Sequence, residues 1–515
     1  MQMKKKKFLL MLLIPLSLIM LGACKEKNDN NKEQTSKIEE LEDSLFDIGC
    51  DGGYGFGGSF GVGAYYGEYD EDGELTIPDK AKFYGGDLED VEISKIFTGA
   101  FKDELKLKKI NIPGSIRDIY GKAFENCTNL KSINFIEEGR KNLTINYDAF
   151  QNTGVEDISI SAKELYIVSN AFAGNLNLKS VNIKADRIVL WDCAFAGNPN
   201  LKNVSIDSKN IEIKGGCFAD VFDASPNIEK FSISDSSYSF EDGLLIHEGE
   251  LIYANGNLEN VNLPDNVLKI GSYAFMNSKI KKIDLNNVKY IYAAAFAGSK
   301  IEEIIGGEFV EYVEYNAFLD TKFTINKEKL VLGSVLAVDS IDTDTYVVDD
   351  NIKSISYVQG KAKNVIIKSN VENIGAYAFS DVSGLEKVYF QSVYGTTSID
   401  SKSFNKDVKL IIPNNTDRYY KENNKSVADR FTTENINITF YKNDEKISTV
   451  SMPYGSFLYE YIPNGYKSVK DKDGNIYNNA DMLFFIEDTD LYLYETDVTW
   501  EWFIKWASAH IVIKK

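Results

Sequence analysis

Cysteine and histidine are scarce in this sequence. The chain of 515 residues has five cysteines and two histidines, too few for a disulfide framework or a transition-metal site. The histidines, His247 and His510, lie far apart, and neither has a serine or cysteine nucleophile motif beside it. The sequence therefore predicts no catalytic residue, no bound metal and no small-molecule cofactor.

Basic residues are outnumbered by acidic ones. The chain has 57 Lys and Arg against 77 Asp and Glu, which gives a formal net charge of −20. An acidic surface should repel nucleic acid and anionic lipid headgroups, so we expect no nucleic-acid partner. We interpret the charge as the property that keeps an extended surface protein soluble.

The first 23 residues have the pattern of a secretion signal. A basic stretch at 4–7 precedes an apolar run at 8–21, which is too short for a confident spanning helix. The sequence Leu21-Gly22-Ala23-Cys24 resembles the lipobox of bacterial lipoproteins. The resemblance implies that residues 1–23 are a lipoprotein signal peptide and that Cys24 receives a diacylglyceryl group. Two long acyl chains suffice for stable attachment, at about 0.8 kcal/mol for each buried methylene.

A polar tether and a glycine-rich stretch follow the leader. Residues 25–42 have almost nothing to bury, so they are predicted to be solvated. The stretch Gly52–Gly63 contains Gly53-x-Gly55-x-x-Gly58, a formal match to the dinucleotide fingerprint, but the flanking pattern lacks the strand and helix that this motif needs. We therefore interpret residues 24–75 as a lipidated tether and a flexible Gly/Tyr-rich linker.

An Ala-Phe pair marks a repeat through the middle of the chain. Its phenylalanines are mostly 21 to 23 residues apart, a period typical of leucine-rich-repeat solenoids. Each repeat has two short apolar segments with strand periodicity. Stacked in register, they predict a mainly β solenoid of about eleven coils with a ladder of phenylalanines inside. These are Phe101, Phe124, Phe150, Phe172, Phe195, Phe275, Phe296, Phe318 and Phe379, with variants at Cys217-Phe218 and Ser403-Phe404.

Insertions interrupt the repeat at two places, and small residues recur at a fixed position within it. Two longer gaps between phenylalanines predict an inserted hairpin at Phe240–Tyr253, and a degenerate hairpin at Lys329–Ala337 followed by a coil that lacks its Ala-Phe pair. Three residues after the ring stand small groups that are predicted to bond loop amides: Cys127, Thr153, Asn175, Asn198, Ser278, Ser299 and Thr321.

Two resemblances extend this interpretation. The repeat at Leu107–Cys127 starts with Leu-x-x-Ile-x-Ile-Pro and ends with Ala-Phe-x-x-Cys, and it resembles the BspA-like leucine-rich repeats of bacterial surface proteins. This resemblance covers residues 76–425. The segments from Ile438 to Tyr494 resemble the Listeria-Bacteroides repeat, which implies a small β-grasp-like module at 430–499. The aromatic tail at 500–515 is either a binding patch or a cover for the end of a domain.

Candidate metal loops and a candidate disulfide are better explained as structural features. Turns at Asp471–Asn475 and Asp70–Gly73 resemble the start of a calcium loop, but Met482 and Ala81 stand where an EF-hand needs glutamate, so we interpret both as turns. Cys193 and Cys217 occupy adjacent coils out of phase with each other. We therefore expect buried free thiols rather than a bridge.

The order of anchor, spacer, solenoid and module predicts function. We expect a bacterial cell-surface lipoprotein, held at the membrane by Cys24, whose solenoid binds an extracellular protein or glycan partner. A structural envelope protein and a glycan-acting enzyme are the alternatives, although no placed pair of carboxylates supports the enzyme. The sequence does not identify the residues that bind the partner.

Overall fold

The computed structural model describes residues 46–50, 59–69, 71–83, 89–137, 141–478 and 480–494. This part is a mainly β solenoid of about 15 turns, which confirms the predicted fold class and exceeds the expected eleven coils because some turns lack the Ala-Phe pair. It divides into two units. The first consists of the residues up to Asn260 together with the segment Gly271–Ile280, and the second consists of the segment Val261–Ile270 together with the residues from Lys281 onward. No helix among the described residues is long and apolar enough to cross a membrane.

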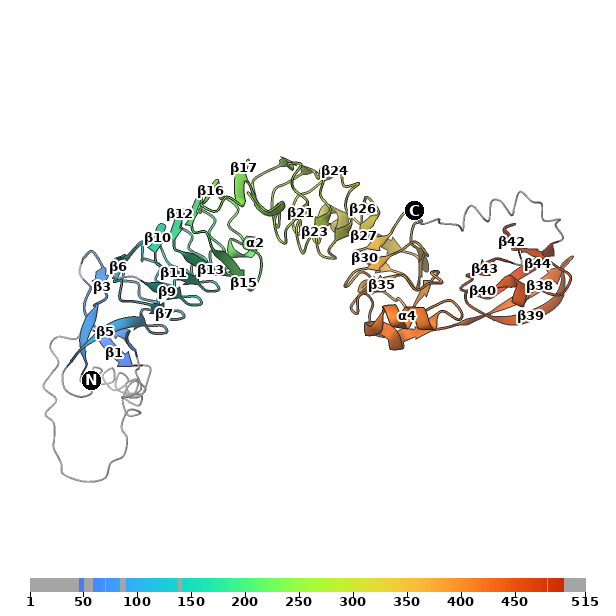
Figure 1. Ribbon diagram of the computed structural model, residues 1–515, viewed down its shortest axis with the longest axis horizontal. Helices are drawn as coiled ribbons and strands as arrows, with labels where there is room; N and C mark the ends of the chain where they lie inside the picture. The colour runs from blue at the N-terminus through green and yellow to red at the C-terminus, as the bar shows by residue number, and fades with distance from the viewer. Residues whose placement is uncertain are drawn as a thin grey trace, which may run out of the picture. The chain divides into compact units, whose positions relative to one another are not determined.

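Most coils of the first unit contribute one short strand to each of two sheets (Figure 1). Inward and outward side chains alternate along each strand, so one face of each sheet packs into the core. The first-strand sheet is parallel and contains β3 (Glu74–Thr76), β6 (Lys109–Ile112), β8 (Ser132–Phe135), β10 (Asp157–Ser161), β12 (Ser180–Lys184), β14 (Asn203–Asp207) and β16 (Lys230–Ile233). The second-strand sheet contains β5 (Glu89–Ile96), β7 (Asp118–Ile119), β9 (Asn142–Ile145), β11 (Glu164–Ile167), β13 (Arg187–Trp191) and β15 (Ile211–Lys214).

An antiparallel hairpin covers the first edge of the second-strand sheet. It consists of β1 (Phe46–Cys50) and β2 (Phe60–Tyr65), and β2 pairs with β5, which also pairs with β4 (Lys80–Phe83). β1, β2 and the start of β3 fall within residues 24–75, and β2 and β3 pair with strands of the solenoid, so the linker was predicted to extend too far. The glycines here allow close packing, since a Cβ on Gly61 would lie 2.8 Å from that of Lys95. The fingerprint at 53–58 lies outside the described residues.

The phenylalanines of the Ala-Phe pairs form the predicted ladder. The five rings from Phe101 to Phe195 are at most 3% exposed and stack with centroids 4.7 to 5.4 Å apart and planes within 4° of parallel. The stack continues at Phe222, not at the predicted Phe218. The helix α2 (Phe218–Val221) precedes this ring, and the amide of Phe195 donates to the carbonyl of Val221, so Phe222 takes the ring position.

The predicted hairpin insertion is present in the first unit. β17 (Tyr238–Glu241), β18 (Leu244–His247) and β19 (Glu250–Ala254) form an antiparallel meander. The turns at Asp242-Gly243 and Glu248-Gly249 have positive φ at both residues, which matches the twist of a tight hairpin. The insertion explains the longer interval before Phe275.

The second unit repeats the two-strand plan with interruptions. Phe296 stacks on Phe318 at 5.0 Å and Phe379 stacks on Phe404 at 5.2 Å, which confirms the Ser403-Phe404 variant. The degenerate hairpin is confirmed as β26 (Leu330–Leu332) with β27 (Val335–Asp342), and in the next coil Val358 replaces the ring.

The strands of the second unit are again of two kinds. First strands are β20 (Asn260–Asn262), β22 (Lys282–Asp284), β24 (Glu303–Ile305), β28 (Thr345–Val347), β31 (Asn364–Ile367), β34 (Lys387–Phe390), β36 (Lys409–Ile411) and β37 (Phe431–Thr432). Second strands are β21 (Lys269–Ile270), β23 (Tyr290–Ile291), β25 (Tyr312–Val313), β29 (Ser354–Ile355), β32 (Asn373–Ile374) and β35 (Ser398–Ile399); the remaining elements are β30 (Val358–Lys361), β33 (Asp381–Ser383), α3 (Lys322–Ile325), α4 (Asp417–Asn423) and η1 (Lys425–Arg430).

A small mixed sheet follows the last coil. The strands lie side by side in the order β39-β38-β44-β41-β42. β38 and β44, which come first and last along the chain, are neighbours in the sheet and run parallel. The β-grasp-like fold of this module and its assignment to the Listeria-Bacteroides repeat both stay predictions. The strands are β38 (Asn435–Lys442), β39 (Glu445–Pro453), β40 (Ser456–Phe457), β41 (Ser468–Lys470), β42 (Ile476–Asn478), β43 (Met482–Leu483) and β44 (Thr489–Tyr494), with η2 (Leu458–Glu460) between β40 and β41.

The module packs on outward side chains of the last coils. Ile366, Tyr389 and Ile411 stand in register on β31, β34 and β36. Tyr389 and Ile411 are at most 2% exposed because they pack with Tyr454 and Phe484 of the module. The end of the solenoid and the module therefore share a small apolar core.

Candidate binding faces of the solenoid

The corner after each ring is held by buried polar groups. Asn175 and Asn198 are fully buried, and the side-chain amide of Asn198 donates to the carbonyls of Phe172 and Phe195 at 3.1 and 2.7 Å. Its carbonyl oxygen accepts from the amide of Asn175 at 2.8 Å. This confirms the predicted role for these residues and extends it to bonds between coils. The hydroxyls of Ser278 and Ser299 are exceptions, because neither has a hydrogen-bond partner.

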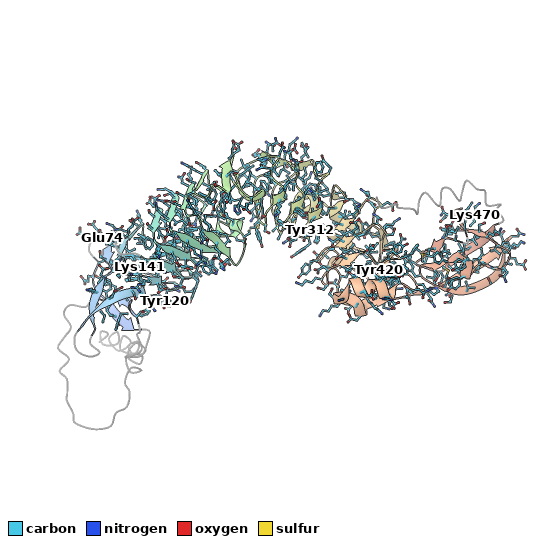
Figure 2. All side chains as sticks on the ribbon, viewed as in Figure 1. Glu74, Tyr120, Lys141, Tyr312, Tyr420 and Lys470 are labelled. Carbon is cyan, nitrogen blue, oxygen red and sulfur yellow. The ribbon has the colours of Figure 1, made fainter. Side chains whose placement is uncertain are left out.

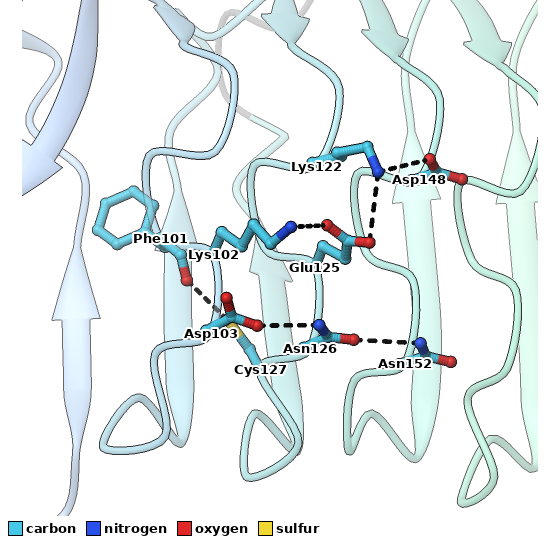
Figure 3. A network of polar contacts seen from close by, with 9 residues as sticks. All are labelled: Phe101, Lys102, Asp103, Lys122, Glu125, Asn126, Cys127, Asp148 and Asn152. Atoms are coloured by element: carbon cyan, nitrogen blue, oxygen red, sulfur yellow. Dashed lines mark hydrogen bonds and ion pairs between the residues drawn. The ribbon is translucent and has the colours of Figure 1, made fainter.

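Charged residues connect the outer side of the corners, as Figure 3 shows. Lys102 forms an ion pair with Glu125 at 2.7 Å, and Lys122 contacts both Glu125 and Asp148 at 3.5 and 3.4 Å. The hydrogen bond from Lys102 lowers the pKa of Glu125, against the opposing effect of partial burial. These contacts hold neighbouring coils together, and we assign them a structural role.

The outward face of the first-strand sheet is uncharged along its centre. One column of polar side chains runs along this centre, and residues in neighbouring coils of the column pair in register. The side-chain amide of Asn134 donates to the side-chain oxygen of Asn111 at 3.0 Å. Such a column resembles a hydrogen-bonded ladder rather than a hot spot, since tight interfaces centre on Trp, Tyr and Arg. Its members are Thr76, Asn111, Asn134, Ser159, Asn182, Ser205 and Ser232.

The outward face of the second-strand sheet in the first unit carries an aromatic and charged cluster. Arg187 and Trp191 lie on the same face of β13, with the buried Ile188 and Leu190 pointing inward. The guanidinium of Arg187 donates to the hydroxyl of Tyr166 at 2.8 Å and lies 5.5 Å from the centre of that ring. We call Tyr166, Arg187, Trp191 and Glu212 the arginine cluster.

Electrostatics fix the orientation of the arginine cluster. Arg187 forms an ion pair with Glu212, and this hydrogen bond raises the pKa of the guanidinium. The hydroxyl of Tyr166 donates to Glu164 at 2.8 Å, and this bond raises the pKa of Tyr166. A preorganised Arg side chain loses less entropy on binding.

Five tyrosines lie on or just after second strands of the second unit. Tyr290 and Tyr312 pair in register on β23 and β25, and each points away from a buried neighbour. Tyr292 lies 6.5 Å from each of those two rings, and the rings of Tyr315 and Tyr377 are 4.7 Å apart. We call these five residues the tyrosine row. Tyr120 and Tyr312, one from each unit, are labelled in Figure 2.

Carboxylates border the tyrosine row. The hydroxyl of Tyr290 donates to Glu311 at 3.0 Å. Burial raises the pKa of Tyr312, and the charges of Glu314 and Asp400 add to this effect. Half-buried tyrosines with polar neighbours supply large contact areas at low entropic cost, which suits a binding surface.

The structure shows where most of the cysteines and histidines considered in the sequence analysis lie. Cys24 and His510 lie outside the described residues, and the ring of His247 stacks on Tyr238 at 4.1 Å. Cys193 and Cys217 are free thiols, as predicted, but both are partly rather than fully buried, and burial raises the pKa of Cys217 to about 12. Among the described residues no group of three or more His, Cys, Asp or Glu side chains is placed to hold a metal ion.

Carboxylates of the C-terminal module line a hollow of about 510 Å³. Asp471 accepts from the amides of Asp473 and Asn475, which confirms the predicted turn. Asp488 accepts in the same way from the amide of Asn437 at 2.8 Å. The carboxylate of Asp471 is therefore engaged within its own turn, and that of Asp488 bonds to the first strand of the module.

The arginine cluster and the tyrosine row were missed by the sequence analysis. Their signal is present in the sequence, since tyrosine, arginine and tryptophan occupy the polar positions of second strands where serine or threonine would suffice. The repeat emphasises its inward residues, and a binding face is by nature the part of each coil that departs from the repeat.

The stacked two-stranded coils and their aromatic spine define a leucine-rich-repeat solenoid. The model of the BspA type leucine rich repeat region matches six copies, over residues 94–223, 219–330 and 350–457. These ranges cover more than half of the sequence, so the chain belongs to the BspA-type leucine-rich repeat family. No curated protein matches the sequence.

Several solved structures of bacterial proteins are similar to this chain. The pneumococcal vaccine antigen PcpA is 20% identical over 73% of this chain and 92% of its own, with a TM-score of 0.47. A leucine rich cell surface protein from Faecalibacterium prausnitzii is 16% identical over 65% of this chain and 90% of its own, with a TM-score of 0.38. A leucine-rich repeat protein from Bacteroides ovatus is 17% identical over 72% of this chain and 99% of its own, with a TM-score of 0.34.

Proposed function

We propose that this chain is a bacterial cell-surface lipoprotein whose second-strand faces bind an extracellular protein or glycan in adhesion. The observation that carries the proposal is the concentration of Tyr, Trp and Arg at outward positions of second strands, while the first-strand face of the first unit carries Asn, Ser and Thr. Tyr, Trp and Arg supply most of the binding energy of protein interfaces. Many weak contacts along a repeated face, multiplied over many anchored copies, give avidity.

The test compares matched variants of the two faces. We expect the double variant Arg187→Ala with Trp191→Ala, or Tyr292→Ala with Tyr312→Ala, to weaken attachment of the full chain to immobilised host-matrix or bacterial-surface extracts about tenfold or more. Losing one or two hot-spot side chains has this effect. The control on the first-strand face is Asn182→Ala with Ser205→Ala, which should change attachment by less than about twofold.

The opposite pattern, in which only the control variant loses attachment, contradicts the proposed binding face. Unchanged attachment of all three double variants contradicts it as well. Circular dichroism of each variant separates loss of binding from loss of fold. A structural envelope role remains the alternative if deletion of residues 76–425 leaves attachment unchanged.

The proposed anchor is Cys24, supported by the lipobox-like sequence Leu21–Cys24. A chain with two acyl groups at its new N-terminus partitions into membranes, whereas the unlipidated chain does not. We expect Cys24→Ser to move most of the chain from the membrane fraction to the soluble or uncleaved precursor pool, measured by fractionation and by intact mass. Membrane association of this variant with unchanged mobility would exclude lipid attachment at Cys24.

A further inference from the structure

The aromatic stack of the first unit lacks one ring at the inserted hairpin. In regular coils the amide of each phenylalanine donates to the alanine carbonyl of the next pair, as Phe124 does to Ala149 and Phe172 does to Ala194. The amide of Ala254 makes this same bond to the carbonyl of Ala274. Ala254 therefore occupies a ring position with a methyl group in place of a phenyl ring.

A half-open pocket lies at this gap. It has a volume of about 290 Å³ and is lined on one side by residues of the coil that contains Phe222, and on the other by Tyr253, Ala254, Tyr273 and Met276. The hydroxyl of Tyr253 is already bonded to the carbonyl of Ser225 at 3.0 Å, so this wall is fixed. The pocket is larger than one missing ring and presents a mainly aromatic and aliphatic lining. We call it the slot.

The chemistry of the slot is acidic as well as aromatic. Asp223 lines it and is half-buried, and burial raises the pKa of this carboxyl, with a further contribution from the nearby charge of Asp220. Among the described residues no ion pair involves Asp223, in contrast to Glu125 and Glu212 elsewhere on the unit, and the carboxylate of Asp220 accepts from the backbone amide of Cys217 at 2.9 Å. A half-buried carboxylate without a cation is stabilised when a cation reaches it.

We propose that the slot is a binding site for an arginine side chain of a protein partner. An arginine suits it because the planar guanidinium stacks on aromatic rings and pairs with a carboxylate through two hydrogen bonds, while its aliphatic stem covers apolar surface. The charge of the slot favours such a cation over an apolar side chain. The site is separate from the arginine cluster and the tyrosine row, and goes beyond the binding function proposed for them.

The test uses blocked tripeptides as probes. Acetyl-Gly-Arg-Gly-amide is titrated into the full chain by calorimetry, beside the same peptide with citrulline, which keeps the shape of arginine and removes its charge. We expect the arginine peptide to bind at about 10 mM or below and the citrulline peptide about tenfold or more weaker. Asp223→Asn should weaken the arginine peptide by a similar factor because it removes the paired charge without changing the size of the side chain.

Two further variants make the result specific. Ala254→Phe places a ring against the slot, which Ala254 lines, so it should abolish peptide binding. Asp186→Asn, in the exposed turn between β12 and β13, makes the same charge change away from the slot and should leave binding unchanged. No binding to the unsubstituted chain at about 10 mM, or equal binding of the arginine and citrulline peptides, overturns the proposal. Equal binding by Asp223→Asn overturns it too, and attachment through the second-strand faces is unaffected by any of these outcomes.

Discussion

Replacing Phe150 by alanine is expected to lower the free energy of unfolding of the first unit by about 3 to 5 kcal/mol. Its ring is fully buried and lies between Phe124 and Phe172, with centroids 4.7 and 5.2 Å away and planes 3° from parallel. The substitution leaves a cavity and removes stacking on both sides. The measurement is urea unfolding followed by circular dichroism.

The matched control for Phe150→Ala is Leu176→Ala. Leu176 is 62% exposed at the corner of the next coil, so its truncation should change stability by less than about 0.5 kcal/mol. A cost below about 1 kcal/mol at Phe150, or equal costs at both positions, would show that the spine does not support the coils. Because contacts in a solenoid are between neighbours, the damage should be concentrated in the coils beside Phe150.

Introducing a carboxylate at Ile411 is expected to release the C-terminal module from the last coils. Ile411 is 1% exposed and belongs to the small core with Tyr389 and Tyr454. A buried carboxylate without a partner costs several kcal/mol, which exceeds what so small an interface can offset. We expect Ile411→Asp to split thermal unfolding of the second unit into two transitions. Protease cleavage between η1 and β38 should also appear.

The control for Ile411→Asp lies in the same column of side chains. Val347 is in register with Ile366, and through it with Tyr389 and Ile411, but is 43% exposed. Val347→Asp makes the same kind of change on the same face without burying the charge, so a single transition should remain. If both variants keep a single transition, the packing of the module on the solenoid does not depend on this column.

The sequence was sufficient for the repeated part of the fold because the inward residues obey one spacing. Leu165 and Ile167 recur as Ile188 and Leu190 in the next coil, and the strands pair at these residues. Period and packing are here the same physical fact, since one coil can only bury its apolar face against another. The inserted hairpin was predictable for a similar reason, since its turns need residues that accept positive φ.

The sequence analysis was wrong about residues whose roles depend on contacts with a neighbouring coil. The stretch that contains Gly61 was interpreted as a flexible linker, whereas the glycine is needed because Lys95 approaches closely. Phe218 was assigned to the ladder by its distance along the chain, and only the backbone pairing of Phe195 with Val221 shows that Phe222 stacks instead. Both errors concern residues whose roles are set by contacts between coils rather than by spacing.

The candidate binding residues were harder to find for a physical reason. Arg187 acquires its orientation from Tyr166 on one neighbouring strand and Glu212 on the other, more than 20 residues away on each side. No local pattern contains all three. The slot at Ala254 is likewise defined by a ring that is absent, and its register is visible only from the bond to Ala274.

The stack of rings has a consequence for how such a chain changes in length. Each ring from Phe124 to Phe195 stacks on one ring before it and one after it, and the backbone bonds follow the same rule. Duplicating or deleting one whole segment therefore leaves every surviving contact of the same kind in place. Evolution can lengthen or shorten the protein, and so set how far its outer face reaches, without redesigning the cross-section.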